Sequence, residues 1–134
     1  MIAADTSTWI AFFDGAPGED VVLLDSALAD RHLVMLPAVL TELLSEPKLS
    51  PAVADLLLDL PLLDVTAGYW ERAGRLRARV LGRRRKARLG DALIAQSCVD
   101  HGVALLTREK DFSAFAEVAK LQVLGAAGHR VKRL

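Results

Sequence analysis

Four acidic side chains stand out because their neighbours are apolar or because they follow a short apolar run. They are Asp5, Glu42, Asp91 and Asp111. Taken singly, each has an ordinary explanation: Asp5 and Asp91 can cap helices, and the other two can face solvent. If they gathered in one place, two carboxylates about 4 Å apart would repel by roughly 4 kcal/mol at an effective dielectric near 20. Either protonation or a bound divalent cation would relieve that repulsion, and a metal site is the more economical explanation of the set.

The types of these side chains indicate which metal and which chemistry to expect. Carboxylate oxygens without histidine or cysteine favour Mg²⁺ or Mn²⁺ over zinc. The three histidines lack the spacing of a zinc-binding pair, and the one cysteine, Cys98, lies among apolar residues that predict a buried structural thiol. Mg²⁺ polarises a phosphate oxygen and lowers the pKa of bound water, while a carboxylate takes the proton. Because no Gly-x-x-x-x-Gly-Lys-Ser/Thr loop is present, we expect metal-dependent phosphoryl transfer outside the P-loop class.

Short apolar runs alternate with helical patterns along the chain, which predicts the elements that position these carboxylates. The expected strands are residues 2–4, 33–36, 62–65, 103–106 and 121–124. The expected helices are residues 6–13, 21–29, 38–45, 51–60, 91–101, 113–118 and one capped by Thr66 that runs to about Leu81. Ser50 should cap the helix that begins at Pro51, and Gly102 should end the helix before it. The Gly18-Glu-Asp20 segment is interpreted as a turn with no further role.

Short strands separated by helices predict an α/β fold with a central parallel sheet. Such a sheet binds ligands beyond the carboxyl ends of its strands. Asp5 and Asp111 both follow predicted strands, and Asp91 opens a helix, so we expect them at the same edge of the sheet.

Length and composition predict one folded domain. The chain has 134 residues, of which 52% are hydrophobic and 25% charged, and this excludes a disordered or low-complexity chain. We expect a core over residues 1–124 and a short tail over 125–134. The N-terminus lacks the basic start of a signal peptide and no apolar run is long enough to span a membrane. The expected location is therefore the cytosol.

The charges are segregated although they balance overall, with 17 basic and 17 acidic side chains. Residues 1–71 carry 12 acidic and 2 basic side chains, whereas residues 72–88 carry nine basic side chains and no acidic one. This distribution predicts a strongly dipolar surface.

Four segments resemble the successive signatures of PIN-domain ribonucleases and, within them, of VapC-type toxins from bacterial type II toxin–antitoxin pairs. They are Asp5-Thr-Ser-Thr-Trp-Ile-Ala-Phe, Thr41-Glu-Leu-Leu44, Gly90-Asp-Ala-Leu-Ile-Ala95 and Leu106-Thr-Arg-Glu-Lys-Asp-Phe112. Their order and spacing extend over residues 1–124. The resemblance implies a three-layer α/β/α sandwich, a Mg²⁺-dependent endoribonuclease (with Mn²⁺ as the alternative ion), a homodimer and a VapB-like antitoxin.

The resemblance also implies roles for particular residues. Asp5, Glu42 and Asp91 match the family's three most regular acidic positions. The family often has Thr-x-Asp in the last loop, where this chain has Thr107-Arg-Glu109 followed by Asp111, so either acidic residue can complete the site. The implied metal ligands are Asp5, Glu42, Asp91 and Glu109, and the implied catalytic carboxylates are Asp5, Glu42, Asp91 and Asp111. The implied substrate contacts are Thr6, Thr107, Arg83, Arg84, Arg85 and Lys86.

Under this interpretation the basic segment holds RNA phosphates or an antitoxin beside an acidic site that would otherwise repel RNA. The alternative is an ordinary solvated helix face. Two other functions also stay open. One is a PIN-like nuclease for RNA maturation or DNA repair without an antitoxin, and the other is a nucleic-acid-binding module that performs no chemistry.

Overall fold

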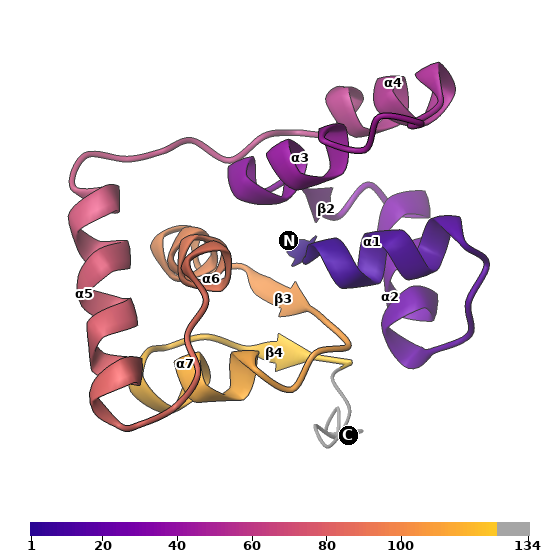
Figure 1. Ribbon diagram of the computed structural model, residues 1–134. Helices are drawn as coiled ribbons and strands as arrows, with labels where there is room; N and C mark the ends of the chain where they lie inside the picture. Colours follow the sequence, from indigo (N-terminus) through magenta and orange to yellow (C-terminus); the bar gives the residue numbers. More distant parts are fainter. Residues whose placement is uncertain (126–134) are drawn as a thin grey trace.

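A four-stranded parallel sheet forms the centre of the computed structural model, which describes residues 1–125 (Figure 1). The strand order is β2-β1-β3-β4, with β1 at Ile2–Ala4, β2 at Leu33–Val34, β3 at Ala104–Leu106 and β4 at Val123–Leu124. Strands β1 and β3 are adjacent, and Ala4 lies opposite Leu106. Asp5 and Thr107, which follow these two residues, are therefore brought side by side although 102 residues separate them.

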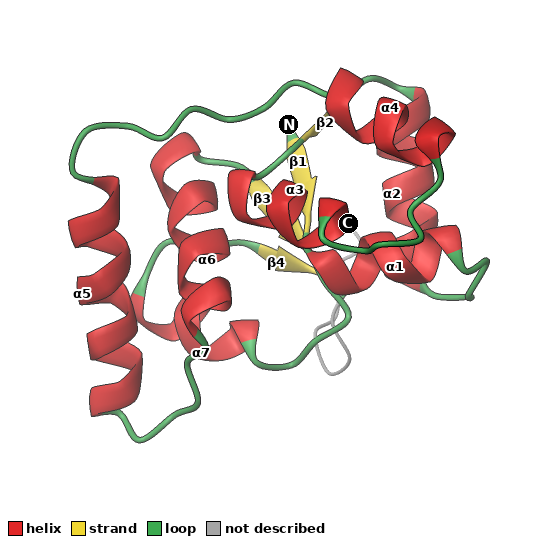
Figure 2. Ribbon diagram, turned by 45° about the horizontal axis from the view of Figure 1, so that its top comes forward, coloured by secondary structure: helices red, strands yellow, loops and turns green. Residues whose placement is uncertain are grey.

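Seven helices surround the sheet within the described residues. They are α1 (Thr6–Phe13), α2 (Glu19–Ala29), α3 (Pro37–Leu44), α4 (Pro51–Asp59), α5 (Tyr69–Gly82), α6 (Leu89–His101) and α7 (Phe112–Val118). Helices α1 and α2 lie on one side of the sheet, and α5, α6 and α7 lie on the other (Figures 1 and 2). The expected α/β fold with a parallel sheet between helical layers is thus confirmed. None of the helices within residues 1–125 has the length and apolar character needed to cross a membrane.

The core is apolar on both faces of the sheet, as expected for short parallel strands covered by helices. Ala3, Leu105 and Leu106 are fully buried, and Trp9 of α1 is buried and stacks on Phe13. Cys98 lies in α6 and is 1% exposed, and burial raises the pKa of its thiol to about 12. The prediction of a buried structural thiol is confirmed, because a thiol with this pKa stays protonated at neutral pH.

Most predicted elements are confirmed with boundaries that differ by one to three residues. Helix α1 spans the predicted residues, and the Ser50 hydroxyl accepts a hydrogen bond from the Val53 amide at the start of α4. Helix α6 ends at Gly102, whose φ of +63° is favourable for glycine. The tail expected from residue 125 falls, for residues 126–134, outside the described part of the chain.

Two local predictions were wrong. The expected strand 62–65 reduces to one parallel bridge between Leu62 and Met35, because this segment lies at the sheet edge with Leu62 half exposed and Asp64 interrupting the apolar run. Thr66 does not cap α5, which begins at Tyr69 after Gly68. The Thr66 hydroxyl accepts a hydrogen bond from Arg72 instead.

Candidate metal centre

Asp5 lies at the carboxyl end of β1 and caps helix α1. Its carboxylate accepts hydrogen bonds from the Thr8 amide (3.0 Å), the Ser7 hydroxyl (2.8 Å) and the Thr107 hydroxyl (2.6 Å). The side chain is buried, and burial raises the pKa of Asp5, although the hydrogen bonds from Thr107 and Thr8 oppose the shift. Asp5 is thus both a helix cap and a carboxylate held by three donors at the carboxyl edge of the sheet.

Asp5, Glu42, Asp91 and Glu109 line a single cavity of about 200 Å³. They come from the end of β1, from α3, from the first turn of α6 and from the loop after β3. The four acidic residues that the family resemblance implied as metal ligands therefore all line this cavity, whereas the oxygens that lie within 4.8 Å of one another belong to Asp91, Glu109 and Asp111. The side chains of Thr6, Ser7 and Arg88 complete the polar part of the wall.

Among these carboxylates, Asp91 has the most strongly shifted pKa. Its Oδ2 atom is buried and has no hydrogen-bond partner among the described residues. Burial, followed by repulsion from Glu109, raises the pKa of Asp91 to about 6, while Arg88 acts in the opposite direction. A buried carboxylate oxygen without a donor costs free energy. The same oxygen is well placed to coordinate a cation, so the Asp91 carboxylate has the properties expected of a metal ligand.

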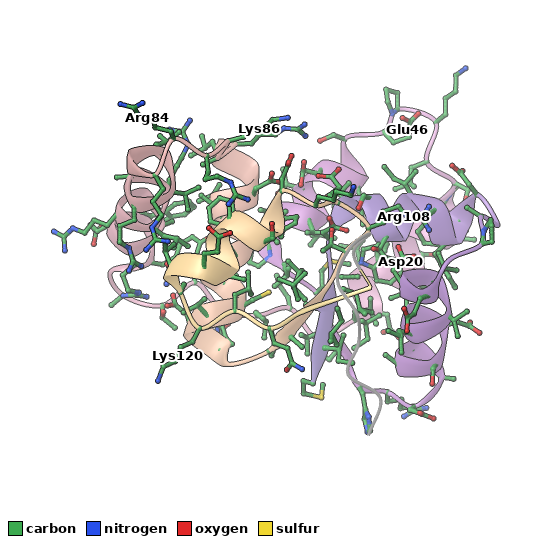
Figure 3. All side chains as sticks on the ribbon, turned by 90° about the horizontal axis from the view of Figure 1, so that it is seen from below. Asp20, Glu46, Arg84, Lys86, Arg108 and Lys120 are labelled. Carbon is green, nitrogen blue, oxygen red and sulfur yellow. The ribbon has the colours of Figure 1, made fainter. Side chains whose placement is uncertain are left out.

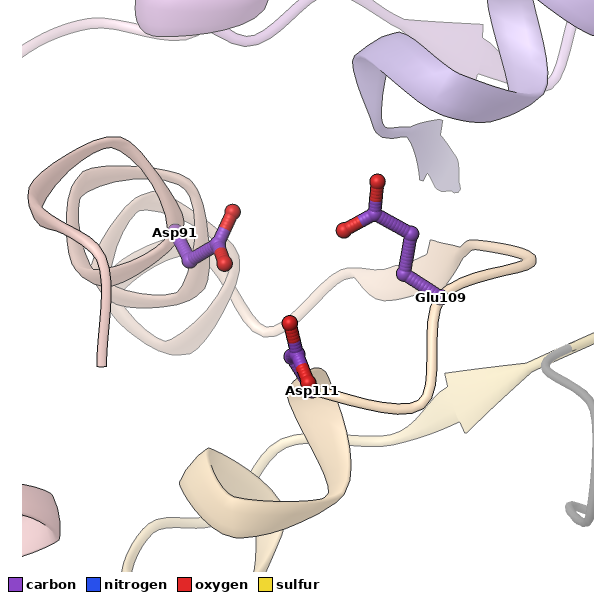
Figure 4. Close-up of side chains that lie close together, drawn as sticks. All are labelled: Asp91, Glu109 and Asp111. Atoms are coloured by element: carbon purple, nitrogen blue, oxygen red, sulfur yellow. The ribbon is translucent and has the colours of Figure 1, made fainter. Parts of the chain in front are cut away.

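Both candidates for the fourth acidic residue lie close to Asp91. One oxygen from each of Asp91, Glu109 and Asp111 lies within 4.8 Å of the other two, and Figure 4 shows the three side chains converging from α6, the loop after β3 and the start of α7. Glu109 lines the cavity. The Asp111 carboxylate is 3.6 Å from Lys86 Nζ and 3.9 Å from Arg88 Nη2. A cluster of carboxylate oxygens alone fits a hard divalent cation.

The resemblance implied Thr6 and Thr107 as substrate contacts, and in the structure both hydroxyl groups donate hydrogen bonds to carboxylates of the site. The Thr6 hydroxyl donates to Glu42 Oε1 at 2.8 Å. The Thr107 hydroxyl donates to Asp5 and accepts the Glu109 amide at 3.0 Å, in a side chain that is 0% exposed. The Thr107 hydroxyl is thus buried, and its hydrogen bonds connect it to Asp5 and to the backbone of Glu109.

The basic residues expected at the substrate lie in the loop between α5 and α6. Arg83, Arg84, Arg85 and Lys86 are all exposed. Arg84 and Lys86 project on the same side of the molecule (Figure 3). Arg85 pairs with Glu117 of α7 at 2.7 Å, so part of this charge holds the loop against its neighbour. The loop places cations next to the acidic cavity, since Lys86 reaches Asp111.

Sequence reasoning missed an ion pair beside the site. The segment 18–20 is more than a turn, because Glu19 and Asp20 begin α2 and Asp20 is 2% exposed. The Asp20 carboxylate accepts two hydrogen bonds from Arg108 (2.9 and 3.0 Å) and one from Thr8 (2.9 Å). Burial would raise the pKa of Asp20, but these donors together hold it below its usual value. An acidic residue that opens a mostly apolar helix was the only signal available in the sequence.

We predict that metal affinity falls at acidic pH. Because the pKa of Asp91 is about 6 without metal, protons compete with the cation below that pH. Ionised Asp91 decreases from about nine-tenths to about one-tenth of molecules between pH 7 and pH 5, so Mn²⁺ affinity should fall about tenfold. Calorimetric titration with Mn²⁺ at pH 5, 6 and 7 measures this. An affinity that does not change over this range would show that Asp91 is no ligand.

Comparison with known proteins gives one family and several structures. The PIN domain family matches residues 2–118. VapBC-1 from nontypeable Haemophilus influenzae has a TM-score of 0.70 at 20% identity, over 93% of this chain and 98% of that chain. DNA-bound VapBC from Salmonella typhimurium has a TM-score of 0.69 at 19% identity, over 92% and 97%. VapBC2 from Rickettsia felis, bound to a promoter DNA fragment, has a TM-score of 0.68 at 20% identity, over 92% and 97%. No match is found among curated proteins. At these identities the structures show a shared fold.

Proposed function

Because the chain belongs to the PIN-domain family, we propose that it is a metal-dependent endoribonuclease and the toxin of a VapBC-type toxin–antitoxin pair. The observation that carries this proposal is the convergence of Asp5, Glu42, Asp91 and Glu109 on one cavity at the carboxyl edge of the sheet. Four segments far apart in sequence supply these carboxylates, and a merely structural role does not require such an arrangement.

Asp5, Glu42, Asp91 and Glu109 are the proposed ligands of Mg²⁺ or Mn²⁺. The bound ion supplies the Lewis acidity that polarises the phosphodiester and activates water. The buried, unpartnered oxygen of Asp91 fits this assignment. Asp111, which lies beside Asp91 and Glu109, is the carboxylate that we assign to accept a proton from the attacking water.

The exposed cations of the loop between α5 and α6 are proposed to bind RNA phosphates. Arg83 and Arg84 have no ion-pair partner among residues 1–125, and Lys86 lies at the edge of the acidic cluster. Their positive charge compensates for the repulsion between RNA and the carboxylates. These contacts carry no sequence information by themselves, so they account for affinity and not for the choice of cleavage site.

The toxin role and a VapB-like antitoxin are proposed from the shared fold and the family resemblance. The three similar structures described above are of VapBC proteins, and two of them are bound to DNA. A homodimer is proposed on the same ground. A nuclease without an antitoxin would have the same cavity, so only an experiment in cells separates the two roles.

The proposal is tested by incubating the purified protein with RNA and Mg²⁺ and sequencing the new 5′ ends. We expect cleavage that stops when the metal is chelated and resumes when Mg²⁺ or Mn²⁺ is restored. Expression in cells should arrest growth, and co-expression of the neighbouring gene should relieve the arrest. RNA binding without cleavage at any metal concentration would instead indicate a module that performs no chemistry. Cleavage without growth arrest would favour RNA maturation or DNA repair.

A further inference from the structure

An ion pair between the buried Asp20 carboxylate and the partly exposed Arg108 lies outside the wall of the acidic cavity. Asp20 belongs to the first turn of α2, and Arg108 belongs to the loop after β3, between Thr107 and Glu109 (Figure 3). The Asp20 side chain is 3% exposed, and Arg108 binds it through both Nε (2.9 Å) and Nη2 (3.0 Å). This paired geometry fixes the direction of the guanidinium as well as its distance.

Pro17 and Gly18 provide a hydrogen-bond acceptor and the space that the Arg108 guanidinium needs. Arg108 Nη2 also donates to the Pro17 carbonyl at 3.1 Å. A Cβ atom added at Gly18 would lie 2.5 Å from Asp20 Oδ1 and 2.7 Å from Arg108 Nη2. Any side chain at position 18 would therefore displace the pair. Residues 17–20 form a socket for Arg108, where the sequence suggested only a turn.

The pair closes a ring of hydrogen bonds that ends on the metal centre. Thr8 donates its hydroxyl to Asp20 and its amide to Asp5. On the other side, Thr107 precedes Arg108 and donates to Asp5, and the Glu109 amide donates to the Thr107 hydroxyl. The ring joins α1, α2 and the loop after β3, so Arg108 holds the loop that carries Thr107 and Glu109 in register with Asp5.

We propose that the Asp20–Arg108 ion pair is a positioning element that holds Thr107 on Asp5 and Glu109 over the acidic cavity. The inference rests on the proposed metal-dependent function, because its consequence is a more ordered set of metal ligands. Arg108 and Asp20 touch neither metal nor substrate in this assignment and act through the residues they orient. Residues that orient metal ligands typically change metal affinity by about 10- to 100-fold when removed.

The test compares Arg108→Gln with Arg72→Gln. Arg72 makes a matched pair with Asp100 through Nε (3.0 Å) and Nη2 (2.7 Å), and the Asp100 side chain is 11% exposed. Asp100 lies nine residues after Asp91 on α6, about 13 Å along the helix axis. We expect both variants to lose thermal stability, but only Arg108→Gln to weaken Mn²⁺ binding by about tenfold or more. Arg108→Lys keeps the charge but not the paired hydrogen bonds, so its Mn²⁺ affinity should lie between those of Arg108→Gln and the unaltered protein.

A second readout needs no metal. Amide hydrogen exchange at Thr8 and Glu109 should be faster in Arg108→Gln than in Arg72→Gln, because both amides belong to the ring. Equal exchange at both amides and equal Mn²⁺ affinity in the two variants would overturn the inference. If the unaltered protein binds no Mn²⁺, the proposed function fails, and exchange at these two amides alone then supports or overturns the positioning role. If Arg108→Gln does not fold, Arg108→Lys is compared with Arg72→Lys by the same two measurements.

Discussion

Asp5→Asn and Asp91→Asn are each expected to reduce the rate of RNA cleavage at least about a thousandfold while the protein stays folded. Either change removes one negative charge and one good ligand from the cavity that both residues line. A metal ion typically contributes several kcal/mol of transition-state stabilisation, and about 4 kcal/mol corresponds to a thousandfold in rate. Asparagine keeps the shape of aspartate and is also a good helix cap, so α1 should still begin after residue 5.

Single-turnover cleavage of RNA in Mg²⁺, measured beside a thermal melt, checks this expectation. Asp55→Asn removes one charge from an exposed position on α4 and serves as the matched control. Thermal melts without metal test a second expectation, which concerns how ionisation of Asp91 affects stability. Since the pKa of Asp91 is raised to about 6 in the folded protein, ionising it costs stability as pH rises from about 4 to above 6. At neutral pH, Asp91→Asn should therefore melt no lower than the unaltered protein. A doubly substituted protein that still cleaves RNA would exclude this cavity as the active site.

The sheet and the convergence of its acidic residues were predictable because they follow from local pattern and one topological rule. The apolar runs Ile2–Ala4 and Ala104–Leu106 become adjacent parallel strands, which places Asp5 beside the loop that carries Glu109. The resemblance carried by four short motifs is confirmed by the family match over residues 2–118. None of this required knowledge of side-chain contacts.

The predictions that failed depended on tertiary context. Residues 62–65 have an apolar run typical of a strand, but within residues 1–125 their pairing stops at the bridge between Leu62 and Met35. Thr66 has a hydroxyl that could cap a helix, but this hydroxyl accepts a hydrogen bond from the Arg72 side chain, and Gly68 is the N-cap residue of α5. Glu109 lines the cavity while both Glu109 and Asp111 lie close to Asp91, an arrangement that spacing along the chain does not encode.

The Asp20–Arg108 pair shows a further limit of sequence reasoning. Its two residues are 88 positions apart, and Asp20 lies outside the four motifs that point to the site. The Asp20 carboxylate is buried where α2 meets Thr8 of α1 and Arg108 of the loop after β3, contacts that exist only in the folded protein. Residues that orient a site are found by following hydrogen bonds outward from its ligands, as from Asp5 through Thr8 to Asp20.

Thr107→Val is expected to lower cleavage about a hundredfold, the largest effect from a residue without charge. Valine has the shape of threonine but loses the hydroxyl that donates to Asp5 at 2.6 Å and accepts the Glu109 amide at 3.0 Å. Each buried group left unpaired costs about 1–3 kcal/mol, and 2.7 kcal/mol corresponds to about a hundredfold in rate. The hydrogen bond from Thr107 also lowers the pKa of Asp5 against the effect of burial. Its loss should raise that pKa and shift the acidic limb of the pH–rate profile to higher pH.

Thr107→Ser distinguishes the contribution of the hydroxyl to the cleavage rate from the contribution of side-chain shape. Serine keeps the donor and acceptor, so cleavage should fall less than tenfold and the acidic limb should stay in place. Thr41→Val makes the same substitution at an exposed site, where the hydroxyl only donates to the Pro37 carbonyl, and it should leave both quantities unchanged. Rates measured from pH 5 to pH 8 compare the three variants. If Thr107→Val cleaves RNA as fast as Thr107→Ser with the same pH profile, Asp5 does not depend on this hydroxyl, and the 2.6 Å contact serves packing alone.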